Sequence, residues 1–163
     1  MTQTWRLQEE TDAALAALRA MVAIADSTVG RNTEQLTLTQ FRALRVVADR
    51  TPVTMGKVAR ELALNPSSVT RACDRLVTLN LLEKAANPLN RRETLLAPTA
   101  AGRQLVERVD HDRRQVLTAV LDRLDPEARA AVTIAFGRFA GAVEAYESDF
   151  PSLLRDANQI TRK

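Results

Sequence analysis

Cysteine and histidine are almost absent from this chain, whose 163 residues include one cysteine, Cys73, and one histidine, His111. A single cysteine cannot form an internal disulfide, and a single histidine cannot anchor a His/Cys metal cluster. Nucleophilic catalysis of the Ser–His or Cys–His type has only His111 available as its base. We therefore expect a protein without enzymatic activity, metal or cofactor.

From the sequence we expect neither a membrane span nor a secretory leader. No apolar stretch approaches the roughly 20 residues that a membrane span needs. The polar N-terminus soon becomes acidic at Glu9 and Glu10, unlike a signal peptide. Hydrophobic residues make up 45% of the chain and charged residues 26%, which is typical of soluble globular proteins. We expect a cytoplasmic protein without membrane contacts, folded as a single domain over residues 1–163.

Positive charge is concentrated in the middle of the chain, although the net charge is only +3. Residues 31–103 contain 12 Lys and Arg against 6 Asp and Glu, whereas the two flanks together contain 11 against 14. A basic segment of this size is what an electrostatic nucleic-acid footprint requires. A solvated surface rich in arginine explains the same count equally well.

Apolar residues spaced three and four apart predict helices over most of the chain. The expected helices cover about 7–29, 37–50, 54–64, 65–79, 98–124 and 128–146, with one short helix beyond Ser148. Thr37 and Gln40 have the spacing of a capping box. Asn65 followed by Pro66 marks the start of another helix, and Asn80 is a candidate left-handed C-cap.

Helical periodicity fails between residues 81 and 96. The runs 81–85 and 93–96 have the composition of short strands, and residues 86–92 between them form a polar, turn-rich tip. This pattern predicts a β-hairpin that has Arg91 and Arg92 at or near its end. Three helices followed by a hairpin, in a basic segment, is the order of a winged helix-turn-helix. The predicted fold class is mainly α with a small β-hairpin wing.

The predicted helix over 65–79 has one apolar face and one polar face. Its first turns carry hydroxyl groups, at the helix end that favours a phosphate. Arg71 is long enough to reach a base edge, with guanine its usual target, and Arg75 follows one turn later. A solvated amphipathic helix has the same pattern, but the hairpin arginines favour DNA binding. The candidate DNA-binding residues are Ser67, Ser68, Thr70, Arg71, Arg75, Arg91 and Arg92.

The chain resembles the MarR family of bacterial transcription regulators, most densely in residues 67–76, 81–84, 87–92 and 98–102. The family's wing pattern is roughly Asp-Pro-x-Asp-Arg-Arg, followed by a strand and Leu-Thr-x-x-Gly. The chain matches the Pro, both arginines, the Thr and the Gly in register. It has Asn87 and Asn90 where the family usually has aspartates, and Pro98 where the family usually has Leu.

The resemblance implies a winged helix-turn-helix lobe at about 36–98, flanked by N- and C-terminal dimerisation helices at about 5–30 and 99–150. It implies a homodimer that binds an inverted-repeat operator in double-stranded DNA. In each subunit the 65–79 helix enters the major groove and the wing reaches the neighbouring minor groove. It further implies a repressor that is released by a small aromatic or lipophilic effector. Apolar helices at both ends of the chain agree with a dimer.

Two other functions explain the same residues: a non-specific or architectural DNA-binding protein, and a helical interaction protein that uses the fold without DNA. Cys73 lies on the inward helix face, which predicts a small buried hydrophobe rather than a redox sensor. His111 and the Arg113–Arg114 pair are predicted to be solvated helix residues rather than a metal or catalytic site.

Overall fold

The structure is a computed structural model that describes the backbone of residues 2–149 and the side chains of residues 6–146. The helices are α1 (Thr2–Asn32), α2 (Leu38–Arg50), α3 (Met55–Leu62), α4 (Pro66–Thr78), α5 (Ala100–Leu121) and α6 (Pro126–Asp149); the strands are β1 (Val53–Thr54), β2 (Leu82–Asn87) and β3 (Asn90–Pro98). The predicted fold class, mainly α with a β-hairpin, is confirmed. The short helix predicted beyond Ser148 lies outside the described residues.

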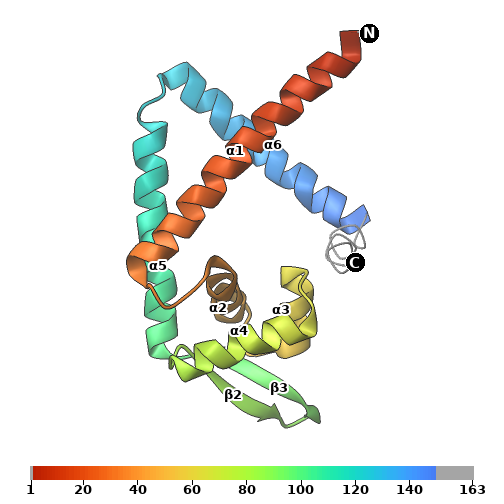
Figure 1. The fold of residues 1–163 in the computed structure, drawn as a ribbon, viewed down its shortest axis with the longest axis vertical. Helices are drawn as coiled ribbons and strands as arrows, with labels where there is room; N and C mark the ends of the chain where they lie inside the picture. Colours follow the sequence, from red (N-terminus) through yellow and green to blue (C-terminus); the bar gives the residue numbers. More distant parts are fainter. Residues whose placement is uncertain (1, 150–163) are drawn as a thin grey trace.

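The elements form a small lobe with long helices attached (Figure 1). The lobe contains α2, α3, α4 and the sheet, while α1 and α6 lie outside it. Helix α5 contacts β3 and α2 at the lobe, packs against α1 further along, and leads to α6. This arrangement leaves α4 and the β2–β3 hairpin on the side of the lobe that faces away from α1 and α6.

Side-chain caps set the helix boundaries of the lobe where the sequence predicted them. The Thr37 Oγ1 accepts from the Gln40 backbone N–H at 3.2 Å, and the Gln40 Oε1 accepts from the Thr37 N–H at 2.9 Å. The Asn65 Oδ1 accepts from the Ser68 N–H at 2.8 Å, which caps α4. Asn80 has a φ of 56°, the left-handed conformation expected of a residue that follows a helix.

The sheet contains a strand that the sequence analysis did not predict. The two-residue strand β1 pairs antiparallel with β3, with Val53 opposite Leu96, so the strand order is β1-β3-β2. Two residues are too few to show a strand periodicity. The hairpin turn is also tighter than predicted, because Pro88 and Leu89 alone connect β2 to β3 in place of the seven-residue tip over 86–92.

The buried core of the lobe is apolar and joins all of its elements. Its fully buried side chains include Phe41, Leu44, Val47, Val58, Val69, Leu76, Leu82 and Leu96. Cys73 is completely buried among them, as predicted, and burial raises the pKa of its thiol to about 11. His111 is exposed, as predicted, with one ring nitrogen 3.0 Å from the Gln115 Nε2.

The prediction that Arg113 is a solvated helix residue is wrong. Its Nε donates to the Thr28 Oγ1 and its Nη2 donates to the Ala25 carbonyl oxygen, both at 3.2 Å. Its guanidinium carbon lies 4.9 Å from the centre of the Phe41 ring, a cation–π contact. Arg113 therefore connects α5 to both α1 and α2, and burial lowers its pKa. The neighbouring Arg114 is exposed, as predicted.

Helix α1 corrects the expectation that no segment is long and apolar enough to cross a membrane. Within Arg6–Asn32 an 18-residue window has a mean hydropathy of 1.4, because alanines alternate with larger apolar residues. Only 11% of that window is buried inside the chain. Large apolar side chains are exposed on both outer helices: Leu7, Leu15, Leu18, Met21 and Val22 on α1, and Ile134, Phe136, Phe139, Val143 and Tyr146 on α6.

Candidate nucleic-acid interface

Helix α4 presents its predicted polar face at the surface of the lobe. Its inward residues Val69, Ala72, Cys73 and Leu76 are buried. Of the five candidate residues on this helix, Ser67, Thr70, Arg71 and Arg75 are exposed and Ser68 is half-buried. The structure therefore brings the α4 candidates together on one accessible face.

The exposed hydroxyl groups on α4 already use their hydrogens within the protein. The Ser67 Oγ donates to the Asn65 Oδ1 at 2.7 Å, and the Thr70 Oγ1 donates to the Pro66 carbonyl oxygen at 2.9 Å. A hydroxyl has one hydrogen to donate. Either group must therefore rotate away from its present partner before it can donate to a phosphate oxygen.

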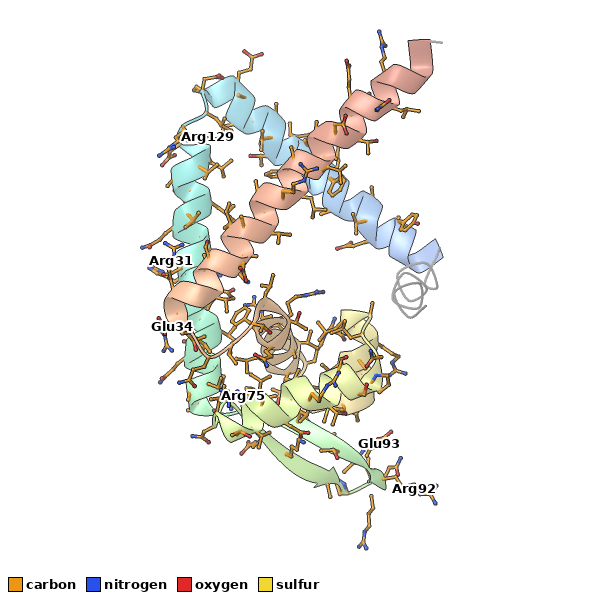
Figure 2. All side chains as sticks on the ribbon, viewed as in Figure 1. Arg31, Glu34, Arg75, Arg92, Glu93 and Arg129 are labelled. Carbon is orange, nitrogen blue, oxygen red and sulfur yellow. The ribbon has the colours of Figure 1, made fainter. Side chains whose placement is uncertain are left out.

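The two arginines of α4 have free charge on the exposed face. The Arg71 Nη2 is 3.4 Å from the Ser68 Oγ, so the guanidinium rests over the first turn of the helix. Arg75 lies in the last turn of α4, away from the hairpin tip where Arg92 lies (Figure 2). Neither guanidinium makes an ion pair within the described part of the chain. Both are available to an anionic partner.

The hairpin carries its arginines on a bulge. The last regular pair joins Ala86 to Thr94, and the next pair joins Asn87 to Asn90. Residues 91–93 of β3 therefore have no partner on β2. The side chains of Arg91 and Arg92 are exposed near the end of the hairpin, where Figure 2 shows Arg92 and Glu93.

The two wing asparagines shape this bulge through their side-chain amides. The Asn87 Oδ1 accepts from the Leu89 N–H at 3.0 Å, while its Nδ2 donates to the Glu93 Oε2 at 2.9 Å. The Asn90 Oδ1 accepts from the Arg92 N–H at 3.2 Å. An aspartate in place of Asn87 has no hydrogen to donate and would repel Glu93. The Asn87 amide can therefore make a hydrogen bond to Glu93 that an aspartate could not.

A hollow of about 440 Å³ lies among β1, α3, α4 and the hairpin. Its lining includes three threonines and four charged residues, namely Arg60 from α3, Lys84 from β2, and Arg92 and Glu93 from β3. The Lys84 ammonium also pairs with the Asp74 carboxylate of α4. Arg60 and Lys84 are not among the DNA-binding residues predicted from the sequence. Their only signal was membership of the basic segment, because the fold brings residues 24 positions apart to one hollow.

Comparison with known proteins identifies the family. The sequence model of the MarR family matches residues 34–93, which include α2, α3, α4, β2 and the bulge of β3. The crystal structure of RV1404 from Mycobacterium tuberculosis is 33% identical in sequence, with a TM-score of 0.74. The match covers 81% of this chain and 90% of that one. The chain belongs to the MarR family.

Two solved structures show how widely this fold is shared. Streptococcus pneumoniae FabT, solved in complex with DNA, is 16% identical with a TM-score of 0.73, over 86% of this chain and 99% of that one. Streptomyces coelicolor PcaV, solved in complex with its natural ligand, is 21% identical with a TM-score of 0.59, over 80% of this chain and 91% of that one. The MarR family consists of transcription regulators, so this MarR protein is a DNA-binding regulator of transcription.

Proposed function

We propose that the chain is a homodimeric, sequence-specific repressor that acts in the cytoplasm and is not an enzyme. Its α4 would enter the major groove of an inverted-repeat operator, and its hairpin would reach the adjacent minor groove. One observation carries this proposal: α4 exposes Arg71 and Arg75, and Thr70 of the same helix lines one hollow together with Arg92 of the bulged hairpin. Arginines serve both contacts, since they bind guanine edges and narrow minor grooves.

The exposed apolar faces of α1 and α6 support the homodimer. Leu18 on α1 is 58% exposed and Phe139 on α6 is 64% exposed, which is costly in water for an isolated chain. A two-fold dimer would cover these faces and place two copies of α4 about one DNA turn apart, roughly 10 bp between half-sites. Light scattering should return twice the mass of one chain.

Binding to a membrane is a competing explanation for the exposed apolar face of α1. Vesicle flotation distinguishes membrane binding from a homodimer. We expect the protein to stay with the buffer when lipid vesicles float. A folded monomer in light scattering would contradict the dimer. Co-flotation with the vesicles would instead assign the α1 surface to lipid.

Arg71 tests whether the protein reads sequence. The preferred duplex is first selected from a random library with the wild-type protein. If Arg71 makes a bidentate base contact, Arg71→Ala should reduce discrimination between this duplex and random DNA by about 1–3 kcal/mol. Arg114→Ala, at an exposed position on α5, is the matched control and should bind as the wild type does.

Two results would redirect the proposal. An equal loss of affinity for both DNAs would make Arg71 a phosphate ligand, because phosphate contacts carry no sequence information. A wild-type protein that shows no preference in the selection would favour the non-specific or architectural alternative. The first result changes only the role assigned to Arg71, whereas the second contradicts sequence-specific binding by the protein.

We also propose that a small aromatic or lipophilic effector releases the repressor. From the family resemblance we expect its site near the junction of α1, α2 and the start of α5, and PcaV, solved with its natural ligand, supports this proposal. Further along α5, the Arg113 guanidinium lies over the Phe41 ring of α2, so a cation and an aromatic ring lie where these three helices pack together. Release requires that the effector bind the DNA-free state more tightly than the DNA-bound state. A compound that stabilises the protein and raises the dissociation constant of the operator would fit; one that leaves this constant unchanged is not an effector.

A further inference from the structure

The hollow between α4 and the hairpin lies where a DNA strand has to pass. If α4 occupies a major groove and the hairpin occupies the adjacent minor groove, one sugar–phosphate strand separates the two grooves. Thr70 of α4 lines one side of the hollow, and Arg92, Glu93 and Thr94 of β3 line another. The strand between the grooves therefore runs along this hollow. This step rests on the function proposed above.

The lining of the hollow has the chemistry that binds a phosphodiester. Its lining contains three cations and one carboxylate, and Thr54, Thr70 and Thr94 add hydroxyl groups. Phosphate oxygens are bound mainly by arginine, lysine and short hydroxyl side chains. Glu93, the carboxylate in the lining, already accepts a hydrogen bond from the Asn87 amide at 2.9 Å.

The cations of the hollow differ in how their charge is used. Arg60 and Arg92 make no ion pair within the described residues. Lys84 is paired with Asp74, whose carboxylate belongs to α4 and holds the ammonium between the helix and the hairpin. Two guanidiniums are therefore free for an anion, and a third cation is already positioned between the two DNA-reading elements.

We propose that this hollow is the binding site of the sugar–phosphate strand between the two grooves, and that Arg60 and Lys84 bind its phosphates. Asp74 is a positioning residue that orients Lys84 before DNA arrives. These contacts are independent of sequence. They fix the distance between the major-groove and minor-groove contacts, because the same strand borders both grooves.

Salt titrations with Arg60→Gln and Lys84→Gln test this binding site for the sugar–phosphate strand. Each lost phosphate contact should make the slope of log affinity against log salt shallower by about one. On raising salt fourfold, each variant should therefore lose about 3.5-fold less affinity than the wild type. The selected duplex and random DNA should be affected alike. Arg114→Gln, which removes one exposed charge from α5, should leave the slope unchanged.

Lys84→Gln needs a second variant, because it also leaves the Asp74 carboxylate facing DNA. The double variant Lys84→Gln/Asp74→Asn removes that repulsion while still lacking the ammonium. A shallower slope that persists in the double variant supports a Lys84–phosphate contact. A slope that returns to the wild-type value means that repulsion by Asp74 caused the loss, and overturns the assignment of Lys84.

Neutral methylphosphonate linkages, placed one at a time in the selected duplex, locate the contact. The wild type should lose affinity at a phosphate between the two grooves, and Arg60→Gln should lose much less at that same phosphate. Equal losses of affinity for wild type and variant at every position would contradict the binding site in the hollow, even if the wild type discriminates strongly between DNAs. Absence of such discrimination would instead contradict the proposed function, while the salt slopes still test the hollow.

Discussion

Gly102 allows a sharp test of how the long helix is joined to the lobe. A Cβ atom added at this position would lie 2.1 Å from the Leu81 carbonyl oxygen and 3.2 Å from the Leu44 Cδ1. The Leu81 oxygen is held in place because it accepts from the Thr99 N–H at 3.1 Å. Side-chain rotation cannot relieve a contact with the backbone, so Gly102→Ala must move α5 or the segment before β2.

The magnitude follows from three opposing effects. Alanine is favoured over glycine within a helix by about 1 kcal/mol. Overpacking of a well-packed core costs about 1–3 kcal/mol, and displacing the Leu81 carbonyl weakens a hydrogen bond that contributes about 1 kcal/mol. We expect Gly102→Ala to lower the free energy of unfolding by about 1–3 kcal/mol.

Urea unfolding followed by circular dichroism measures this change. Wild type and variants are compared at one protomer concentration, because dimerisation adds to the apparent stability. Gly30→Ala on α1 is the matched control, since no atom lies within 4 Å of its added Cβ. The control should gain up to about 1 kcal/mol. If Gly102→Ala proves as stable as Gly30→Ala, the close packing of α5 against Leu81 is wrong.

Three further predictions concern the Cys73 thiol, the half-buried Arg113 and the wing. Burial raises the pKa of Cys73 to about 11, so its thiol should react slowly with alkylating reagents at pH 8 in the native protein and rapidly in urea. The folded state holds the thiol proton more tightly than the unfolded state, so the free energy of unfolding should fall as the pH rises from 9 toward 11. Rapid labelling of the native protein would contradict the burial of Cys73. Arg113→Met should lower the free energy of unfolding by about 1–3 kcal/mol, because both hydrogen bonds to α1 are lost, whereas Arg114→Met should change little in the same urea titration. Arg92→Ala should weaken binding to selected and random DNA by similar factors and make the salt slope shallower by about one; an unchanged slope with intact affinity would leave Arg91 as the wing's DNA contact.

Much of the fold was predictable because its signals are local. The capping pairs at Thr37 and Asn65 involve residues within one helical turn, so the sequence contains both partners of each hydrogen bond. The inward position of Cys73 follows from helical spacing alone, and the same spacing places Arg71 on the opposite, exposed face. A hairpin is likewise a local unit, and its strands were found within a few residues of their observed ends.

The remaining features depend on residues that meet only after folding. Strand β1 forms because its backbone pairs with β3, and Arg113 is half-buried because it contacts α1 and Phe41 of α2. The pattern around each of these residues is that of an ordinary loop or helix surface. Arg60 and Lys84 likewise belong to separate elements with no shared periodicity, and they border one hollow because the helices and the hairpin pack against the same core. Local spacing specifies which face of an element a side chain occupies, whereas its partners depend on which elements pack against that face.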